Sequence, residues 1–121
     1  MASIIDIHPH VISTDTARYP LQPLGGNQST WSRDRPTSYD TMIKEMDNAG
    51  VAKSAIVQAS TAYGHDNSYV AEAIAAHPKR FTGVFSVDML AADNVEKMKH
   101  WLARGFAGMR LFTSTMPGQA T

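Results

Sequence analysis

The chain alternates short runs of β-branched and apolar residues with longer segments of helical periodicity, and this alternation restricts its fold more than any other feature. Strands are predicted at residues 3–7, 54–59, 82–87 and 107–112, each bounded by Gly, Pro or polar residues. Strands that alternate with helices are typical of βαβ units, whose strands form a parallel sheet. The sequence therefore predicts an α/β fold built from parallel βα repeats.

Three segments between these strands have helical spacing. The first covers about 38–49, with Thr37 or Ser38 as its cap and a stop at Gly50. The second covers about 68–77, with Asp66 or Asn67 as its cap. The third begins after a possible capping box, Asp93 with Glu96, and ends at Gly105; its buried stripe is expected at Val95, Met98, Trp101 and Leu102.

The composition excludes several classes of function. Its 11 basic and 11 acidic residues cancel, so we expect small molecules or other protein chains as partners, with no nucleic acid and no membrane. Without cysteine, a metal site would use histidine and carboxylate ligands. No apolar run reaches the ~18 residues of a membrane span, and the polar N-terminal segment is unlike a secretory signal. We expect one soluble, cytoplasmic domain, residues 1–121.

The most informative segment is the end of the first strand. Residues two apart on an extended chain share a face, so Asp6, His8 and His10 should line up while Ile5 and Ile7 face the helices. The proline at position 9 cannot donate to a sheet ladder, which places the histidines at the carboxyl end of the strand, where α/β proteins build active sites. A His-x-His triplet alone is common and unspecific, but this placement favours a metal site. The interpretation requires both rings to project into one polar cavity from an interior parallel strand.

A connection of nearly 30 residues, 9–36, follows the first strand. It is rich in Pro, Gly, Ser, Thr and Arg and has no periodicity, which is typical of either a functional or a disordered loop. Tyr19 and Trp31 would anchor it. We therefore expect an ordered loop that folds over a site.

The segment Asp6-Ile7-His8-Pro9-His10 resembles the Asp-x-His-x-His signature that opens the first barrel strand of the amidohydrolase superfamily, especially its lactonase and aromatic decarboxylase branch. The likeness extends over the whole chain. Its other elements are Tyr19-Pro20, Ala49-Gly50-Val51, Val57-Gln58-Ala59-Ser60, Gly64-His65-Asp66-Asn67, His77-Pro78, Arg80-Phe81 and Gly105-Phe106-Ala107-Gly108-Met109-Arg110-Leu111.

The resemblance implies the first half of a (β/α)8 TIM barrel, with His8 and His10 as ligands of a divalent metal, zinc or alternatively manganese. Such a metal activates water for attack on an ester, lactone or amide, or holds a substrate carboxylate during decarboxylation. The remaining His and Asp ligands would come from later strands. Some lactonase-like members work without metal, in which case the two histidines would bind substrate.

Other polar residues fall at the predicted carboxyl ends of the strands. Arg110 could clamp a substrate carboxylate or form a structural ion pair, and neither is favoured. His65 and Gln58 are candidate substrate contacts, whereas Asp66 is better explained as a helix cap. The leading hypothesis is a metal-dependent hydrolase of a lactone or other carboxylated cyclic substrate. The alternatives are a metal-dependent decarboxylase and a noncatalytic α/β binding module.

A complete barrel needs about 250 residues, whereas this chain has 121. Four parallel strands with right-handed crossovers would carry their helices on one face and leave the other face and both edges open. The chain could be a truncated product, which is the preferred explanation and could leave it inactive. Alternatively, a homo-oligomer closes the half-barrel, or the strands form a small open sandwich.

Overall fold

The computed structural model describes residues 2–112, which form a four-stranded, fully parallel sheet in the order β1-β2-β3-β4. The strands are β1 (Ile4–Asp6), β2 (Val51–Val57), β3 (Phe81–Ser86) and β4 (Phe106–Arg110). The predicted parallel βα repeat is confirmed. The largest boundary error is at β2, which begins three residues before the predicted start at Ser54.

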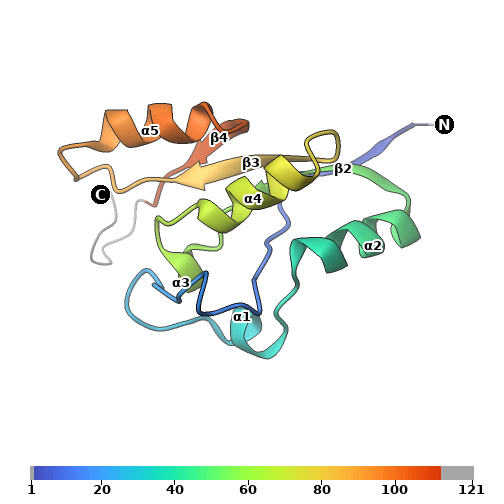
Figure 1. The fold of residues 1–121 in the computed structure, drawn as a ribbon, viewed down its shortest axis with the longest axis horizontal. Helices are drawn as coiled ribbons and strands as arrows, with labels where there is room; N and C mark the ends of the chain where they lie inside the picture. The colour runs from blue at the N-terminus through green and yellow to red at the C-terminus, as the bar shows by residue number, and fades with distance from the viewer. Residues whose placement is uncertain (1, 113–121) are drawn as a thin grey trace.

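Three longer helices, α2 (Tyr39–Ala49), α4 (Ser68–Ala76) and α5 (Asn94–Leu102), connect the strands, and each packs against the strand that follows it (Figure 1). Two short helices, α1 (Thr30–Asp34) and α3 (Ser60–Tyr63), lie where loops were predicted. Both stand near the carboxyl ends of the strands, on the left and lower side of Figure 1. None of the helices in residues 2–112 is long and apolar enough to cross a membrane.

The ends of α2 and α4 follow the predicted chemistry. The Ser38 hydroxyl accepts a hydrogen bond from the Thr41 amide at 3.2 Å, and Gly50 closes α2 with a left-handed φ of 72°. Asn67, one of the two predicted caps, occupies the N-cap position of α4, but its side chain makes no capping hydrogen bond. Asp66, one residue earlier, accepts a hydrogen bond from the Ser68 amide at 3.1 Å.

The predictions for α5 were wrong in two respects. Within the described chain, the Asp93 carboxylate pairs with Lys97 at 3.5 Å and caps no backbone amide. Val95 and Leu102 are 53% and 52% exposed, so the predicted buried stripe narrows to two partly buried residues, Met98 and Trp101. The physical reason is that α5 packs mainly on β4, which is the edge strand of the described sheet.

The prediction that Ile5 and Ile7 face the helices was also wrong. They are 57% and 74% exposed, and Ile7 lies beyond the end of β1. The pairing of β1 with β2 shifts register between Ile4 and Ile5, which breaks the simple alternation of faces. In the described sheet β1 is an edge strand, and Ile5 borders a hollow of about 880 Å³ beside Ala55 and Thr82.

The long first loop is ordered, as predicted, and aromatic residues hold it against the core. Tyr19 is 8% exposed, and its ring lies 4.8 Å from that of Tyr69 between centroids. The Tyr63 hydroxyl accepts a hydrogen bond from the Ser13 amide at 2.8 Å. This packing brings the loop over the ends of the strands.

Candidate active site at the carboxyl ends of the strands

His8 and His10 lie side by side just beyond β1. Backbone pairing with β2 continues through Pro9, whose carbonyl accepts from the Val57 amide at 2.9 Å. The Asp6 carboxylate accepts a hydrogen bond from the His8 amide at 3.1 Å. This bond stabilises the turn between β1 and the two histidines. The two imidazole centroids are 5.2 Å apart, with ring planes at 83°. The rings lie close together, which meets one part of the metal-site interpretation. The other parts are not met in the described sheet, because β1 is an edge strand, and His8 is exposed and does not line the hollow beside His10.

This spacing fits two ligands of one tetrahedral metal. With zinc–nitrogen bonds of about 2.0 Å and tetrahedral angles, two ligating imidazole rings have centroids roughly 5 Å apart. The donor set is only part of a catalytic site, which needs three protein ligands. Among residues 2–112, no three His, Asp or Glu side chains form a group that could hold a metal. The pair can supply two ligands.

His10 is the more constrained of the two histidines. Its Nδ1 lies 2.7 Å from the Val57 carbonyl oxygen, and it must donate because a carbonyl can only accept. This fixes the tautomer and leaves Nε2 as the nitrogen that can ligate. Trp31 stacks on the ring at 5.2 Å between centroids, with the planes 29° apart. Burial, together with the charges of His8 and Arg110, lowers the pKa of His10, against the opposing effect of the Val57 hydrogen bond.

Arg110 ends β4 and is half-buried. Its Nη1 donates to the Gln58 carbonyl at 3.4 Å, and its guanidinium lies 4.3 Å from the centroid of the Phe112 ring. Burial lowers its pKa. The described residues place no carboxylate in ion-pair contact with Arg110, so the alternative of a structural ion pair has no partner there. A guanidinium without an acidic partner can donate hydrogen bonds to the carboxylate of a bound ligand.

His65 and Gln58 belong to a buried hydrogen-bond network. Gln58 is 1% exposed, and its Nε2 donates to the carbonyls of Gly64 at 3.1 Å and Asp66 at 2.7 Å. His65 Nδ1 lies 3.1 Å from the Ser86 hydroxyl. Gln58 thus holds the turn that carries His65, and substrate contact by either side chain stays a prediction.

Sequence analysis missed Ser86 and Asn67, which complete this network. Asn67 exchanges two hydrogen bonds of 2.9 Å with the Ser86 backbone, and both residues are 0% exposed. Their signal was weak: Ser86 fell inside a predicted strand, and Asn67 was considered only as a cap.

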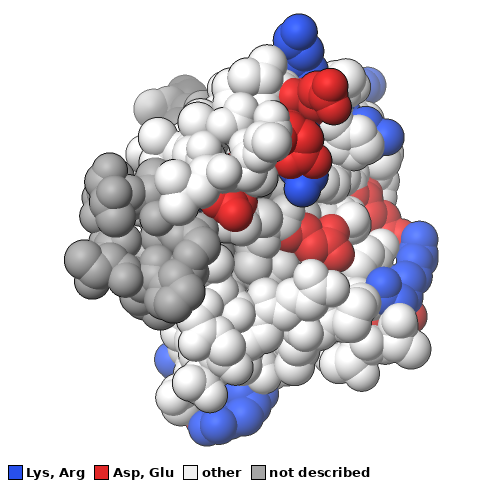
Figure 2. Space-filling view, turned by 90° about the vertical axis from the view of Figure 1, so that its left-hand side faces the viewer, with Lys and Arg blue, Asp and Glu red and all other residues white. Residues whose placement is uncertain are grey.

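Two hollows open near this end of the molecule. A small one of about 300 Å³ borders His10 and is lined by His10, Ile12, Trp31, Arg35 and Thr37. A larger groove of about 740 Å³ lies between residues 22–25, residues 64–66 and α5, and includes Asp66, Asp93 and Glu96. Figure 2 shows acidic side chains gathered over the upper and central part of this end. The small hollow borders His10, one member of the histidine pair, whereas the groove borders His65 and the three carboxylates; among the described residues, neither hollow is lined by His8 or Arg110.

Comparison with known proteins assigns the family. The family model described as Amidohydrolase matches residues 5–121. The chain belongs to the amidohydrolase family. A comparison of this amidohydrolase with curated proteins gives no match.

Solved structures share the fold of this amidohydrolase. A probable 2-pyrone-4,6-dicarboxylic acid hydrolase of Acinetobacter baumannii, solved with citric acid bound, has a TM-score of 0.71 and 24% identity, over 91% of this chain and 38% of that one. A Pseudomonas putida protein with a similar assignment has a TM-score of 0.70 and 21% identity, over 97% and 40%. 2,6-Dihydroxybenzoate decarboxylase from Rhizobium has a TM-score of 0.61 and 18% identity, over 90% and 38%.

The amidohydrolase chain spans only 38–40% of the length of these solved chains. Its four parallel strands and connecting helices match part of their TIM barrels, and the predicted half-barrel is confirmed. At these identities the likeness establishes the fold and leaves substrate and chemistry open.

Proposed function

We propose that this amidohydrolase is a metal-dependent hydrolase of a lactone or another carboxylated cyclic substrate. The observation that carries the proposal is the pairing of His8 with His10, within reach of the charge of Arg110, a guanidinium without an acidic partner among the described residues. The pair offers imidazole nitrogen ligands, and the guanidinium of the arginine can donate two hydrogen bonds to a carboxylate. The neighbouring 2-pyrone-4,6-dicarboxylic acid hydrolases support this substrate class.

His8 and His10 would hold zinc, or alternatively manganese, and the remaining ligands would come from further strands of a complete barrel. When bound, such a metal polarises the substrate carbonyl and activates water. The Val57 carbonyl keeps His10 in the tautomer whose Nε2 can bind. Arg110 would orient the substrate by its carboxylate, so that the ring ester faces the histidines.

The first test is metal binding to the 121-residue chain. We expect calorimetric titration with Zn²⁺ to show one site per chain, lost in the His8→Ala and His10→Ala variants. His100→Ala is the matched control, because this exposed histidine lies on α5 against Trp101. Equal zinc affinity in the native chain and in both site variants would contradict the metal assignment.

The second test separates the two substrate chemistries. 2-Pyrone-4,6-dicarboxylate should bind the native chain and bind Arg110→Gln at least about tenfold more weakly, the loss expected for a charged hydrogen bond worth 1.5–3 kcal/mol. If a dihydroxybenzoate binds instead, and a completed barrel releases carbon dioxide from it, the chain is a decarboxylase. A chain that binds no metal and neither ligand would be a noncatalytic module.

A further inference from the structure

Trp31, which was predicted only as an anchor of the first loop, is the only aromatic residue outside the histidine pair that contacts His10 in the described chain. It lies on α1, a five-residue helix in the long first loop, about 20 residues along the chain from His10. The two rings are nearly parallel. A stack of this kind opposes tilting of the imidazole ring out of its plane, because tilting would lose the contact between the ring faces.

We propose that α1 is an orienting element for the site, with Trp31 as the positioning residue of His10 and a hydroxyl cluster that holds α1 in place. Only the expected effect on metal affinity rests on the proposed function. The orientation itself can be measured without metal.

The need for such an element follows from the chemistry of histidine. The torsion that turns an imidazole ring is broad and roughly two-fold, so a 180° flip costs little unless neighbours oppose it. A flip would move the Nδ1 donor of His10 away from the Val57 carbonyl and turn Nε2 out of the site. A 180° flip keeps the ring in its plane, so the hydrogen bond selects between the two flipped states, and the stacked indole holds the ring in the plane in which that hydrogen bond is made.

A helix as short as α1 is not stable by itself, so an indole on it can orient a partner only if α1 is tethered. The tether is a cluster of three hydroxyls. Ser29 Oγ donates to Ser32 Oγ at 2.7 Å, and Thr61 Oγ1 donates to Ser29 Oγ at 2.8 Å. Ser32 Oγ in turn donates to the Ser29 carbonyl at 3.0 Å and is 1% exposed.

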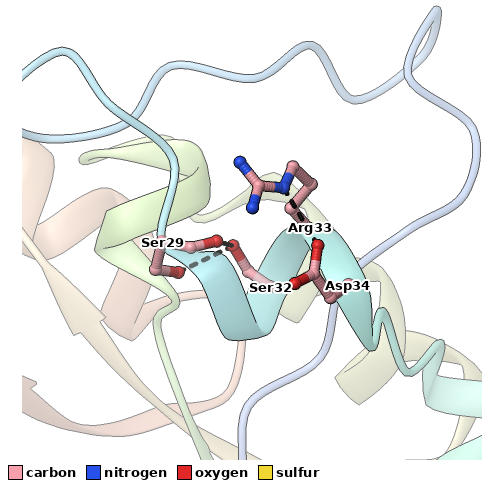
Figure 3. Close-up of polar contacts among 4 residues, drawn as sticks. All are labelled: Ser29, Ser32, Arg33 and Asp34. Carbon is pink, nitrogen blue, oxygen red and sulfur yellow. Dashed lines mark hydrogen bonds and ion pairs between the residues drawn. The ribbon is translucent and has the colours of Figure 1, made fainter.

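Figure 3 shows Ser29 and Ser32 facing one another across the first turn of α1, and Arg33 and Asp34 paired with each other further along the helix. The backbone adds a further link, since the Ser29 amide donates to the Thr61 carbonyl at 3.2 Å. Thr61 belongs to α3, which follows β2 directly. The cluster therefore joins the loop element to the strand whose Val57 carbonyl binds His10.

The experiment is nitrogen NMR of the 121-residue chain labelled on histidine, at pH 8 without metal, with His10 assigned through a His10→Gln variant. We expect native His10 to show the Nδ1–H tautomer. Trp31→Leu should mix in the Nε2–H tautomer, whereas Trp31→Phe, which keeps an aromatic face, should retain the native signal. Trp101→Leu, the same change at the other tryptophan, is the control for lost packing and should leave His10 unchanged.

Zinc affinity gives the second readout. Trp31→Leu should weaken binding about threefold to tenfold, the range of an aromatic pair worth 0.5–1.5 kcal/mol. Thr61→Val, which removes one hydroxyl at constant shape, should shift the His10 signals in the same direction. A native tautomer in both Trp31→Leu and Thr61→Val would overturn the inference. If native chain binds no zinc while the tautomer responds, the proposed metal role fails and the orienting role stands.

Discussion

Replacement of Gln58 by Met should destabilise the fold far more than loss of one polar surface group. Methionine keeps the unbranched shape but cannot donate to the carbonyls of Gly64 and Asp66, which Gln58 Nε2 contacts at 3.1 and 2.7 Å. Each neutral hydrogen bond contributes about 1 kcal/mol net. The Gly64 carbonyl would still accept from the Ser86 hydroxyl at 3.3 Å, so the further cost of about 1–3 kcal/mol for a carbonyl left without a donor applies to Asp66. Since Gln58 is 1% exposed, water cannot replace the amide. We expect a loss of about 3 kcal/mol.

Urea denaturation followed by circular dichroism measures this loss, and thermal unfolding should show a melting point lower by more than about 10 °C. Gln22→Met is the matched control: Gln22 is exposed, and its change should stay within about 0.5 kcal/mol. A Gln58→Met chain as stable as the control would refute the reasoning that this amide holds the turn. If that chain lost ligand binding alone, the substrate-contact prediction for Gln58 would be the better account.

Three further outcomes follow from the structure. Folding lowers the pKa of His10 from 6.5, so below about pH 6.5 the unfolded chain binds more protons at His10 than the folded chain does, and the free energy of unfolding should fall as the pH drops. Urea denaturation at several pH values measures this slope, and His10→Gln should flatten it. Gly83→Ala would place a Cβ 2.7 Å from Phe106 Cδ1 and should cost about 1–3 kcal/mol, whereas Gly108→Ala, with its nearest atom at 3.6 Å, should cost little. If copies of the chain close the half-barrel, light scattering should show a dimer that Ile5→Lys dissociates, and a monomer at all concentrations would exclude that partner.

The order of strands and helices was predictable because each signal is local. Ser38 and Gly50 mark the ends of α2 by their own backbone and side-chain chemistry, and the apolar runs need only their neighbours to be recognised. Helices α1 and α3 were missed because five and four residues cannot show a helical period. They exist through contacts between distant segments, such as the bond between Ser29 and Thr61.

The candidate site was predictable in part for the same reason. His8 and His10 are two residues apart, so their proximity follows from local geometry. The stacking of Trp31 on His10 depends on the path of the whole first loop, which no local pattern encodes. Nor could alternation predict the exposure of Ile5, because the register shift in β1 arises from pairing with β2.

The exposed first strand and the incomplete donor set are physically related. Ile4, Ile5 and Ile7 are all more than half exposed at one edge of the described sheet, beside the two histidines. A structure that covered this edge with further parallel strands would bury those side chains, and at the same time its strand ends would bring new ligands to His8 and His10. Metal would then bind the closed barrel more tightly than the half-barrel and, by linkage, would favour closure. Zinc should therefore promote association of this chain with whatever supplies the missing strands, and His8→Ala should abolish that promotion without removing the apolar edge.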